Sequence, residues 1–373
     1  MRRICYISGT RADFGLMQST LQQIARVSDL SVIATGMHLS AAHGLTVKEI
    51  RSAGLRITAE VPVAMEPATG ATMARGIGAM IGAFITAFEA EKPDIVLLLG
   101  DRGEMLAGAI AAIHLNIPVA HIHGGERSGT VDEPVRHAIS KLAHIHFAAT
   151  EGARVRLMAM GENPAHVHVS GAPGLDGLAN DVRAPRSEVA ARYGLDPARP
   201  IALMVFHPVL QEAARAGKDA RAILTVLNIA AMQVIALMPN ADAGSAGVRD
   251  ALENTENRIG LSVQTHLARP DFLDAMAIAD VMIGNSSAGI IEAASFGTPV
   301  INIGRRQNLR ERNANVVDVA DTSTIGKALA TVLAKGRYTP NNIYGKGTAG
   351  YTISALLSGY SLDDGLMMKV NGY

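Results

Sequence analysis

Short apolar runs alternate with longer Ala- and Met-rich segments along the chain. In the first half, the runs that predict strands are RICYISGT, SVIATGM, DIVLLLGD, PVAHIHGG and HIHFAAT. The segments 14–27, 76–91 and 104–115 between them predict helices. Parallel strands that are buried on both faces lose the alternation of polar and apolar residues, and DIVLLL has lost it. The pattern is typical of an α/β protein with a parallel sheet covered by helices.

A domain boundary is predicted where Gly, Pro and Asp gather in VHVSGAPGLDGL, ahead of a polar stretch at 180–200. A second α/β set follows in IALMVFHP, VIALMPNAD, LSVQTHLA, VMIGNSS and PVINIG. We therefore expect two doubly wound Rossmann-like domains, over residues 1–175 and 176–355, and a C-terminal segment at 356–373 that packs back on the first domain. Two such domains facing each other place the carboxyl ends of both sheets on one central cleft, where open α/β sheets bind ligands.

Composition and charge narrow the function classes. Of the 373 residues, 48% are hydrophobic and 18% are charged, which describes a globular chain and argues against disorder. Lys+Arg and Asp+Glu balance at 34 each, so no overall field attracts nucleic acid or an anionic membrane. The longest apolar stretch, at 77–88, is shorter than the roughly 20 residues of a membrane span. With one cysteine and no cleavage signal, we expect a cytoplasmic protein.

Candidate chemistry gathers at the ends of the predicted strands, in GTRADFG, GDRGEM, HIHGGE, FHP, PNAD and GNSSAG. In the last of these, Ser286, Ser287 and Gly289 open a helix that is expected to continue through Glu292. Free backbone N–H groups and the helix dipole at such a start form a phosphate site, and the alternative is a plain serine N-cap. Arginines follow that would clamp a diphosphate or form a solvated basic loop: Arg305, Arg306 and Arg310.

A second group consists of acidic residues at neighbouring strand ends, namely Asp101, Glu104, Glu126, Asp132 and Glu133. Acidic groups that share one cleft repel each other, so some of their pKa values rise and acid–base roles become available. The alternative is a set of caps and salt bridges with Arg102, Arg127 and Arg136. His207, at the start of the second domain, either faces these acids or caps a turn.

The histidines raise the question of a metal. His121 and His123 lie on one strand face and, with Glu126, resemble a set of zinc ligands. Two further i, i+2 pairs, at 144/146 and 166/168, make the spacing a habit of this sequence, and no fourth ligand is evident. We expect no metal.

Together these motifs resemble the hydrolysing UDP-N-acetylglucosamine 2-epimerases of bacterial sialic and legionaminic acid biosynthesis. The matching pieces span residues 10–307 and are GTRADFGLM, TGMHLS, GDRGEML, HIHGGERSGTVDEPVRHAISKLAHIHF, FHPV, PNADAG and GNSSAGIIEAASFGTPVINIGRRQ. The resemblance implies a fold similar to glycosyltransferase family B, a UDP site on the second domain, and no cofactor. In such enzymes UDP leaves C1 as the C2 proton is removed, which gives a 2-acetamidoglucal. Water then adds at C1, C2 is reprotonated from the opposite face, and UDP and N-acetylmannosamine are released.

The resemblance also assigns roles to residues. Asp101 and Asp132 would handle protons, while His207, Arg306 and the helix start at Ser286 and Ser287 would hold the diphosphate. Sugar or phosphate contacts are implied for Glu133, Arg136 and Arg11. The expected substrate-binding set is completed by Arg102, His137, Asn240, Asp242, Gly289 and Glu292, the last of them on the ribose.

Two positions depart from the family pattern. Several relatives read HIEGGE, so His123 occupies the position of a proposed catalytic carboxylate. Either His123 takes over an acid–base role or Glu126 supplies the carboxylate. Gly103 stands where GDRYEM-like versions carry an aromatic residue, and a larger or less polar sugar pocket would fit UDP-2,4-diacetamido-2,4,6-trideoxyglucose (UDP-diacetylbacillosamine) as the alternative substrate. The predicted catalytic residues are therefore Asp101, His123, Glu126, Asp132 and His207.

Other functions compete with this one. A non-hydrolysing epimerase would recapture UDP, a glycosyltransferase would need an acceptor groove, and a silent UDP-sugar-binding protein would not need the acids. The expected partners are a UDP-sugar and further copies of the chain, in a homodimer or homotetramer. The apolar helix at 77–88 is a candidate contact surface, and burial in the domain core is the alternative.

Overall fold

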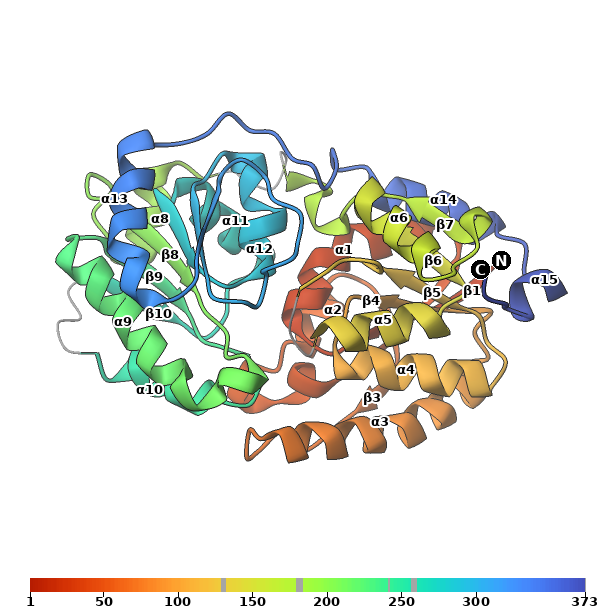
Figure 1. The fold of residues 1–373 in the computed structure, drawn as a ribbon. Coiled ribbons are helices and arrows are strands. Elements are labelled where there is room, and N and C mark those ends of the chain that lie inside the picture. The colour runs from red at the N-terminus through yellow and green to blue at the C-terminus, as the bar shows by residue number, and fades with distance from the viewer. Residues whose placement is uncertain (129–131, 179–183, 241, 256–259, 373) are drawn as a thin grey trace.

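Two parallel sheets, each covered by helices, form the two halves of the molecule (Figure 1). The computed structural model describes residues 1–128, 132–178, 184–240, 242–255 and 260–372. Within these ranges the first sheet has seven strands in the order β3-β2-β1-β4-β5-β6-β7 and the second has six in the order β10-β9-β8-β11-β12-β13. In each sheet the strand order reverses next to its first strand, and the crevice at such a switch point is where open α/β sheets bind ligands. The predicted fold class is confirmed.

The first sheet consists of β1 Arg3–Ser8, β2 Asp29–Thr35, β3 Arg56–Val61, β4 Ile95–Leu99, β5 Val119–Ile122, β6 Ile145–Ala148 and β7 Val167–Val169. Its helices are α1 Arg11–Val27, α2 Val47–Ser52, α3 Gly70–Glu91, α4 Gly103–His114, α5 Asp132–Leu142 and α6 Glu151–Ala159. The three predicted helices are present, and α3 begins six residues earlier than expected, after the N-cap Thr69. Sequence patterning missed β3 and β7, because neither presents a continuous apolar run.

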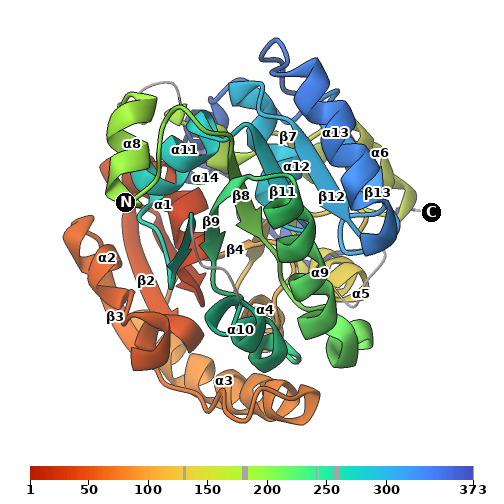
Figure 2. The same cartoon turned by 90° about the vertical axis from the view of Figure 1, so that its left-hand side faces the viewer.

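The second sheet consists of β8 Ile201–Val205, β9 Gln233–Leu237, β10 Leu261–Gln264, β11 Val281–Gly284, β12 Val300–Ile303 and β13 Val316–Val319. Its helices are α8 Arg186–Arg192, α9 Ala216–Ile229, α10 Ser245–Glu253, α11 Arg269–Ile278, α12 Ser287–Ile291 and α13 Ile325–Lys335. Viewed along this half, α9 and α13 lie on one side of the strands and α8 and α11 on the other (Figure 2). Each side has its own apolar core, so the strands are buried on both faces.

After α13 the chain crosses back to the first sheet. There α14 Ala349–Gly359 packs against α1, with Ile353 and Leu357 in the same apolar core as Phe14 and Leu21 (Figure 1). The backbone N–H of Ala349 donates to Asp176, 2.9 Å away. After α14 the chain forms the short helix α15 Asp364–Met367. The expected limit at 355 falls inside α14. The domain limits at 175 and 355 stay a prediction.

Helix α3 is 22 residues long, and its most apolar 18-residue window has a mean hydropathy of 1.4. The helix is longer than the 12-residue apolar stretch at 77–88 that was expected from the sequence. By length and composition alone it is long and apolar enough to cross a membrane. A single such helix is weak evidence for a span, because core helices pass the same test. One side of α3 packs on the first domain through Met80, Phe84 and Phe88, and only 28% of its most apolar window is buried.

Candidate active site

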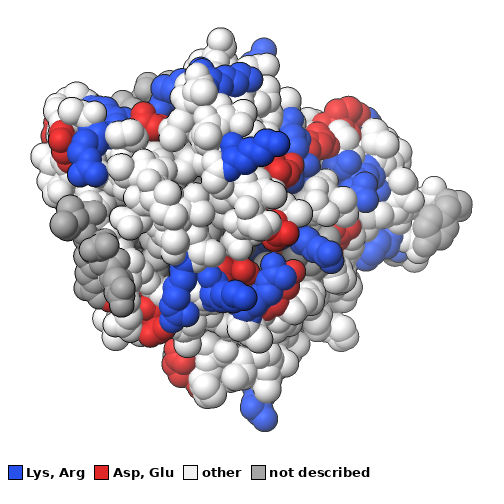
Figure 3. Space-filling view, turned by 60° about the vertical axis from the view of Figure 1, so that its left-hand side comes forward, with Lys and Arg blue, Asp and Glu red and all other residues white. Residues whose placement is uncertain are grey.

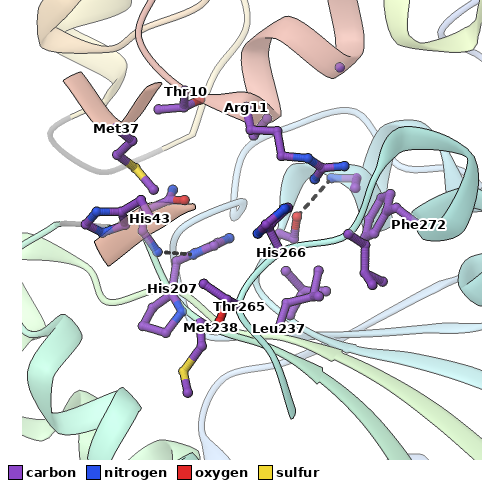
Figure 4. Close-up of a pocket in the computed structure, with 18 of the residues that line it drawn as sticks. Thr10, Arg11, Met37, His43, His207, Leu237, Met238, Thr265, His266 and Phe272 are labelled. Carbon is purple, nitrogen blue, oxygen red and sulfur yellow. Dashed lines mark hydrogen bonds between the residues drawn. The ribbon is translucent and has the colours of Figure 1, made fainter. Parts of the chain in front are cut away.

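Two adjoining cavities lie between the halves of the molecule. The first, here named the β9 chamber, has a volume of about 170 Å³ and is lined by residues that include Leu237, Met238, His266 and Phe272 of the second domain. Thr10 and Arg11, at the start of α1, lie on its opposite wall (Figure 4). The second, the α3 chamber, has a volume of about 330 Å³ and is lined by α3, by the loop before α4 and by Asp132. Met37 lines both chambers.

The loop after β11 is built for a close approach of backbone to backbone. Gly284 has a φ of 138°, and a Cβ atom there would meet the carbonyl oxygen of Val205 at 2.1 Å. Only glycine avoids that clash. The next residue, Asn285, accepts from the His207 N–H and donates to the His207 carbonyl, both at 2.8 Å. The ends of β8 and β11 are thereby fixed together.

The predicted helix start follows this loop. Ser286 is the N-cap of α12, with its Oγ accepting from Ala288 N at 3.3 Å, and both Ser286 and Ser287 line the β9 chamber. The helix is shorter than predicted, because α12 ends at Ile291 and a 3-10 helix, Ala293–Phe296, follows Glu292. Gly289 faces the sheet, where a Cβ atom would come within 3.0 Å of Val300 Cγ1. The N-cap of α12 is therefore part of the wall of the β9 chamber.

Arg306 and His207 stand between the two chambers. Arg306 lines the α3 chamber and donates to the Asn285 carbonyl at 3.1 Å, whereas His207 lines the β9 chamber. Burial, and the nearby Arg306 charge, lower the pKa of His207 to about 3, so its ring is neutral at pH 7. His207 Nδ1 accepts from the Asn240 N–H at 3.3 Å. A neutral ring beside a guanidinium suits an anionic ligand, since neither group repels it.

The pKa values of the two candidate proton carriers, Asp101 and Asp132, are shifted in opposite directions. Burial acts to raise the pKa of Asp101, but Arg136, Arg310 and Arg306 outweigh it and lower the pKa to about 2. Burial raises the pKa of Asp132, and the Asp101 charge adds to that effect. Both carboxyl groups line the α3 chamber. Carboxyl groups whose pKa values are driven apart in one cavity can take separate acid and base roles.

Ion pairs connect these acids with the second domain. Arg310 contacts Asp101 at 3.8 Å and forms a close pair with Glu126, and Arg306 lies 3.9 Å from Asp132. Arg102 Nη2 lies 3.6 Å from Asp242, with Glu104 on the other side of the guanidinium. Figure 3 shows basic and acidic side chains side by side in the middle of the face shown. The sequence offered salt bridges with Arg102 and Arg136 as the alternative to repulsion among the acids, and the structure adds Arg306 and Arg310 from the second domain.

His123 and Glu126 form a buried pair. His123 Nδ1 lies 2.5 Å from Glu126 Oε1, and the other oxygen of Glu126 pairs with Arg310. Burial, followed by the charges of Arg310 and Arg136, lowers the pKa of His123 to about 3, so the ring is neutral at pH 7. With Nδ1–H directed at Glu126, the lone pair of a neutral ring is on Nε2. Both oxygens of Glu126 are therefore occupied.

Some predicted site residues lie behind the chamber walls. Arg136 is 1% exposed and donates to Asp101 and, at 3.0 Å, to the carbonyl of Glu126. Glu133 accepts from the Ser128 N–H at 2.7 Å, and His137 lies 3.6 Å from Glu133. None of Arg136, Glu133 and His137 is among the residues that line the two chambers. Their contacts position Asp101 and the loop that carries Glu126.

Most of the remaining predicted contacts line the β9 chamber. Arg11 is bound to Glu49, with Nε 3.0 Å from Oε1, and lines this chamber. Glu292 is 2% exposed and pairs with Arg269, and burial raises the pKa of its carboxyl group. Asn240 lines the β9 chamber too, whereas Asp242 lines the α3 chamber. Sequence reasoning missed the apolar and aromatic lining, because Leu237, Met238 and Phe272 read as ordinary core positions.

Apart from His123, the histidines of the three i, i+2 pairs make structural contacts. His121 is held between Ser140 Oγ at 3.1 Å and the Gly100 carbonyl at 2.7 Å. His146 contacts Glu162 at 2.9 Å, and both His166 and His168 contact the Tyr360 hydroxyl. Over the described part of the chain, no three His, Cys, Asp or Glu side chains are grouped as a metal would need.

The comparison with known proteins decides the family. A family model described as UDP-N-acetylglucosamine 2-epimerase matches residues 22–358. The chain belongs to this family. It is 46% identical to a UDP-N,N'-diacetylbacillosamine 2-epimerase (hydrolyzing) of Legionella pneumophila, over 100% of both chains. It is also 35% identical to a UDP-N-acetylglucosamine 2-epimerase of Neisseria meningitidis, over 93% of this chain and 92% of the other. The prediction of a hydrolysing UDP-sugar 2-epimerase is confirmed at the level of family and enzyme class.

Solved structures confirm the epimerase fold. A crystal structure of a UDP-N-acetylglucosamine 2-epimerase from Neisseria meningitidis bound to UDP-N-acetylglucosamine has a TM-score of 0.79 with this chain, at 18% identity. The match covers 96% of this chain and 99% of the other. A Staphylococcus aureus MnaA–UDP structure gives the same TM-score over 96% and 97%. The predicted arrangement of two Rossmann-like domains around a cleft is that of these epimerases.

Proposed function

We propose that this epimerase is hydrolysing and converts a UDP-activated 2-acetamido sugar of the gluco configuration into UDP and the free manno sugar. The observation that carries the proposal is the pair Asp101 and Asp132, which share the α3 chamber with opposite pKa shifts beside Arg306. A hydrolase that changes the configuration at C2 needs one group to accept a proton and another to return it on the opposite face. Two carboxyl groups in unlike environments meet that need.

The two chambers give the substrate its orientation in this proposal. The nucleoside occupies the β9 chamber, which is lined by Leu237, Met238 and Phe272, with Glu292 near the ribose. The diphosphate lies at the junction, against His207, Arg306 and the start of α12. The sugar then projects into the α3 chamber, next to Asp101 and Asp132. This placement puts the negative diphosphate against Arg306, which also offsets the charges of Asp101 and Asp132.

The reaction proceeds in two steps. The C1–O bond breaks and its electron pair leaves with UDP, while a base takes the C2 proton and the electrons of the C2–H bond form the C1–C2 double bond. Arg306 stabilises the charge that develops on the leaving diphosphate. In the second step an acid delivers a proton to C2 from the opposite face, and the electrons of the double bond form the new C2–H bond. The oxygen of a water molecule bonds to C1, and this water gives up one of its protons to a base. The products are UDP and the C2-inverted sugar, so atoms and charge balance.

His123 and Glu126, at the HIHGGE position, line neither chamber, but Arg310 connects the pair to Asp101. The proposal assigns a proton exchange to His123 and a positioning role to Glu126. The support is that both oxygens of Glu126 are engaged, by His123 and Arg310, whereas a neutral His123 has a free lone pair. We expect His123→Gln to lower kcat about 10²- to 10⁴-fold. Glu126→Gln keeps a hydrogen-bonding partner for His123, so we expect a smaller loss together with a displaced pH profile. A larger loss in Glu126→Gln than in His123→Gln would return the role to the carboxylate.

Two sugars compete as the substrate. The Legionella relative, at 46% identity, is named for diacetylbacillosamine, and the Neisseria relative, at 35%, for N-acetylglucosamine. The higher identity supports UDP-2,4-diacetamido-2,4,6-trideoxyglucose, which the sequence suggested as the alternative to UDP-N-acetylglucosamine. Proton NMR in D2O with each sugar tests the whole proposal. We expect UDP and a manno sugar deuterated at C2 from at least one of the two UDP-sugars. If neither UDP-sugar gives these products, the function is refuted.

We further infer that the enzyme is a homodimer or homotetramer in which α3 contributes to the contact. The support is the low burial of this apolar helix, whose most hydrophobic window is 28% buried. Light scattering of the purified protein at micromolar concentration gives the mass directly, and a monomer would overturn the inference.

A further inference from the structure

The α3 chamber has two unlike walls. On one side lie the charged groups Asp101, Arg102 and Asp132. On the other side lies α3, which presents Met73, Ile77 and Met80 to the cavity. The structure describes the whole of α3, and the polar side chain that it brings to this wall is Thr72, 9% exposed and 3.0 Å from the Thr69 hydroxyl.

Neighbouring segments extend the apolar wall. The further aliphatic side chains that line the chamber are Val63, Met65, Val135, Val209 and Leu210. They come from the loop after β3, from α5 and from the loop after β8, so three separate segments place aliphatic groups around one cavity. A wall of this kind gives a ligand no hydrogen bonds and gains from methyl groups.

Gly103 brings this wall close to the chemistry. A Cβ atom at Gly103 would lie 2.7 Å from Ile77 Cδ1, so the tip of Ile77 occupies the space that any other residue at position 103 would need. Gly103 is two residues from Asp101 in sequence. The aliphatic wall therefore reaches the edge of the proton-transfer site, and a sugar held for reaction at C2 must present its other substituents to that wall.

We propose that Ile77, seated against Gly103 and flanked by Met73 and Met80, determines the sugar specificity of this enzyme. It selects UDP-2-acetamido sugars that carry a methyl group at C6 over sugars with a hydroxyl group there. This inference rests on the proposed function, which places C1 and C2 beside Asp101 and Asp132. Since C4 lies across the ring from C1, the C4 and C6 substituents project away from the diphosphate and toward α3. Against this wall a hydroxyl group loses its bonds to water without replacement, whereas a methyl group gains burial.

The test compares two sugars on the full-length enzyme, by kcat/KM and by competition of each intact UDP-sugar with bound UDP. For the wild type we expect about a 100-fold preference for UDP-2,4-diacetamido-2,4,6-trideoxyglucose over UDP-N-acetylglucosamine, the level at which apolar pockets discriminate against an added hydroxyl. Ile77→Thr places a hydroxyl in the wall, and we expect the preference to fall about 10-fold.

Ile81→Thr is the matched control. Ile81 is on the same helix, is half-buried like Ile77 and packs in the same core, but it does not line the chamber. The same substitution there leaves the preference at its wild-type value. Gly103→Ala is a second variant, because its Cβ pushes the Ile77 tip into the cavity and lowers kcat/KM for the bulkier sugar more than for UDP-N-acetylglucosamine.

The outcomes separate this inference from the function. If both sugars bind and react within about threefold of each other, or if Ile77→Thr and Ile81→Thr change the preference equally, the specificity assignment is wrong and the epimerase function stands. A third outcome is that neither sugar reacts, while in competition binding the wild type prefers the expected sugar and Ile77→Thr weakens that preference. The function is then wrong and the apolar wall still selects the ligand. A wild-type preference for UDP-N-acetylglucosamine overturns the inference outright.

Discussion

Asp101→Asn keeps the shape of a side chain at the centre of the site and removes its charge. In the native protein the pKa of Asp101 falls from 3.8 to about 2 because Arg136, Arg310 and Arg306 outweigh the effect of burial. Each pKa unit corresponds to about 1.4 kcal/mol, so these interactions favour the ionised form by about 2 kcal/mol. The Asp101 side chain is 21% exposed, which leaves most of that value unscreened.

The sign of the stability change follows from this pKa. A carboxyl group whose folded pKa is depressed stabilises the native state above its unfolded pKa, and this stability is lost as pH falls from 3.8 toward about 2. Between pH 5 and 8 Asp101 is ionised in both states, so we expect Asp101→Asn to lower the free energy of unfolding by up to about 2 kcal/mol, independent of pH in this range. Thermal unfolding at three pH values measures it.

The functional change is larger than the change in stability. Loss of a proton-transfer group costs about 10²- to 10⁴-fold in kcat, measured as UDP release and as deuterium uptake at C2 in D2O. Affinity for UDP alone stays equal or increases, because the substitution removes a negative charge beside Arg306 and Arg310. Turnover within 10-fold of wild type would remove Asp101 from the mechanism. A weakened UDP complex would show instead that Asp101 acts by positioning the arginines.

Two further predictions concern the diphosphate and the ion cluster behind the first sheet. Arg306→Met removes a guanidinium that is 17% exposed at the chamber junction, and we expect about 10- to 100-fold weaker UDP binding by calorimetry, whereas Arg305→Met, at an exposed neighbour, leaves it unchanged. Equal effects of the two substitutions would contradict the assignment. Glu162, 1% exposed at its side chain, has its pKa lowered from 4.5 to about 2 by His146 and Lys141 against the effect of burial. We expect Glu162→Gln to lower the free energy of unfolding by about 3 kcal/mol at pH 7. The wild type loses the same contribution as pH falls from 4.5 toward 2. We expect kcat to stay unchanged, because Glu162 lines neither chamber and its partners Lys141, His146 and Lys369 are not site residues. An unchanged Tm would refute this pairing energy.

The elements that patterning predicted and those that it missed differ in one respect. β4 is a continuous apolar run, so burial on both faces is written into its composition. β3 has the sequence RITAEV and is half-exposed at the edge of the sheet, where little burial is required. Ile57, Ala59 and Val61 alternate with polar residues, as is typical of a half-buried strand, and β3 pairs with β2.

The candidate site divides in a similar way. Six loops at strand ends could be predicted from the sequence, because the carboxyl ends of parallel strands converge on one edge whatever the details of packing. The sequence also indicated that acids in one cleft repel each other, and Asp132 behaves so. It offered a salt bridge with Arg136 only as the alternative, and it did not pair Asp101 with Arg310, which lies 209 residues further along the chain. Opposite pKa shifts in two neighbouring carboxyl groups depend on which guanidinium is nearest in space.

The sequence by itself determined the fold class, the family and the set of loops that carry the chemistry, because hydrophobic periodicity and strand-end motifs are local properties of the chain. Only the tertiary structure decided which charges neutralise one another across the two domains, and that the α3 chamber joins carboxyl groups to an aliphatic wall. Electrostatic and hydrophobic interactions act over a few ångströms, and the residues concerned, such as Ile77 and Gly103 or Asp101 and Arg310, become neighbours only when the chain has folded.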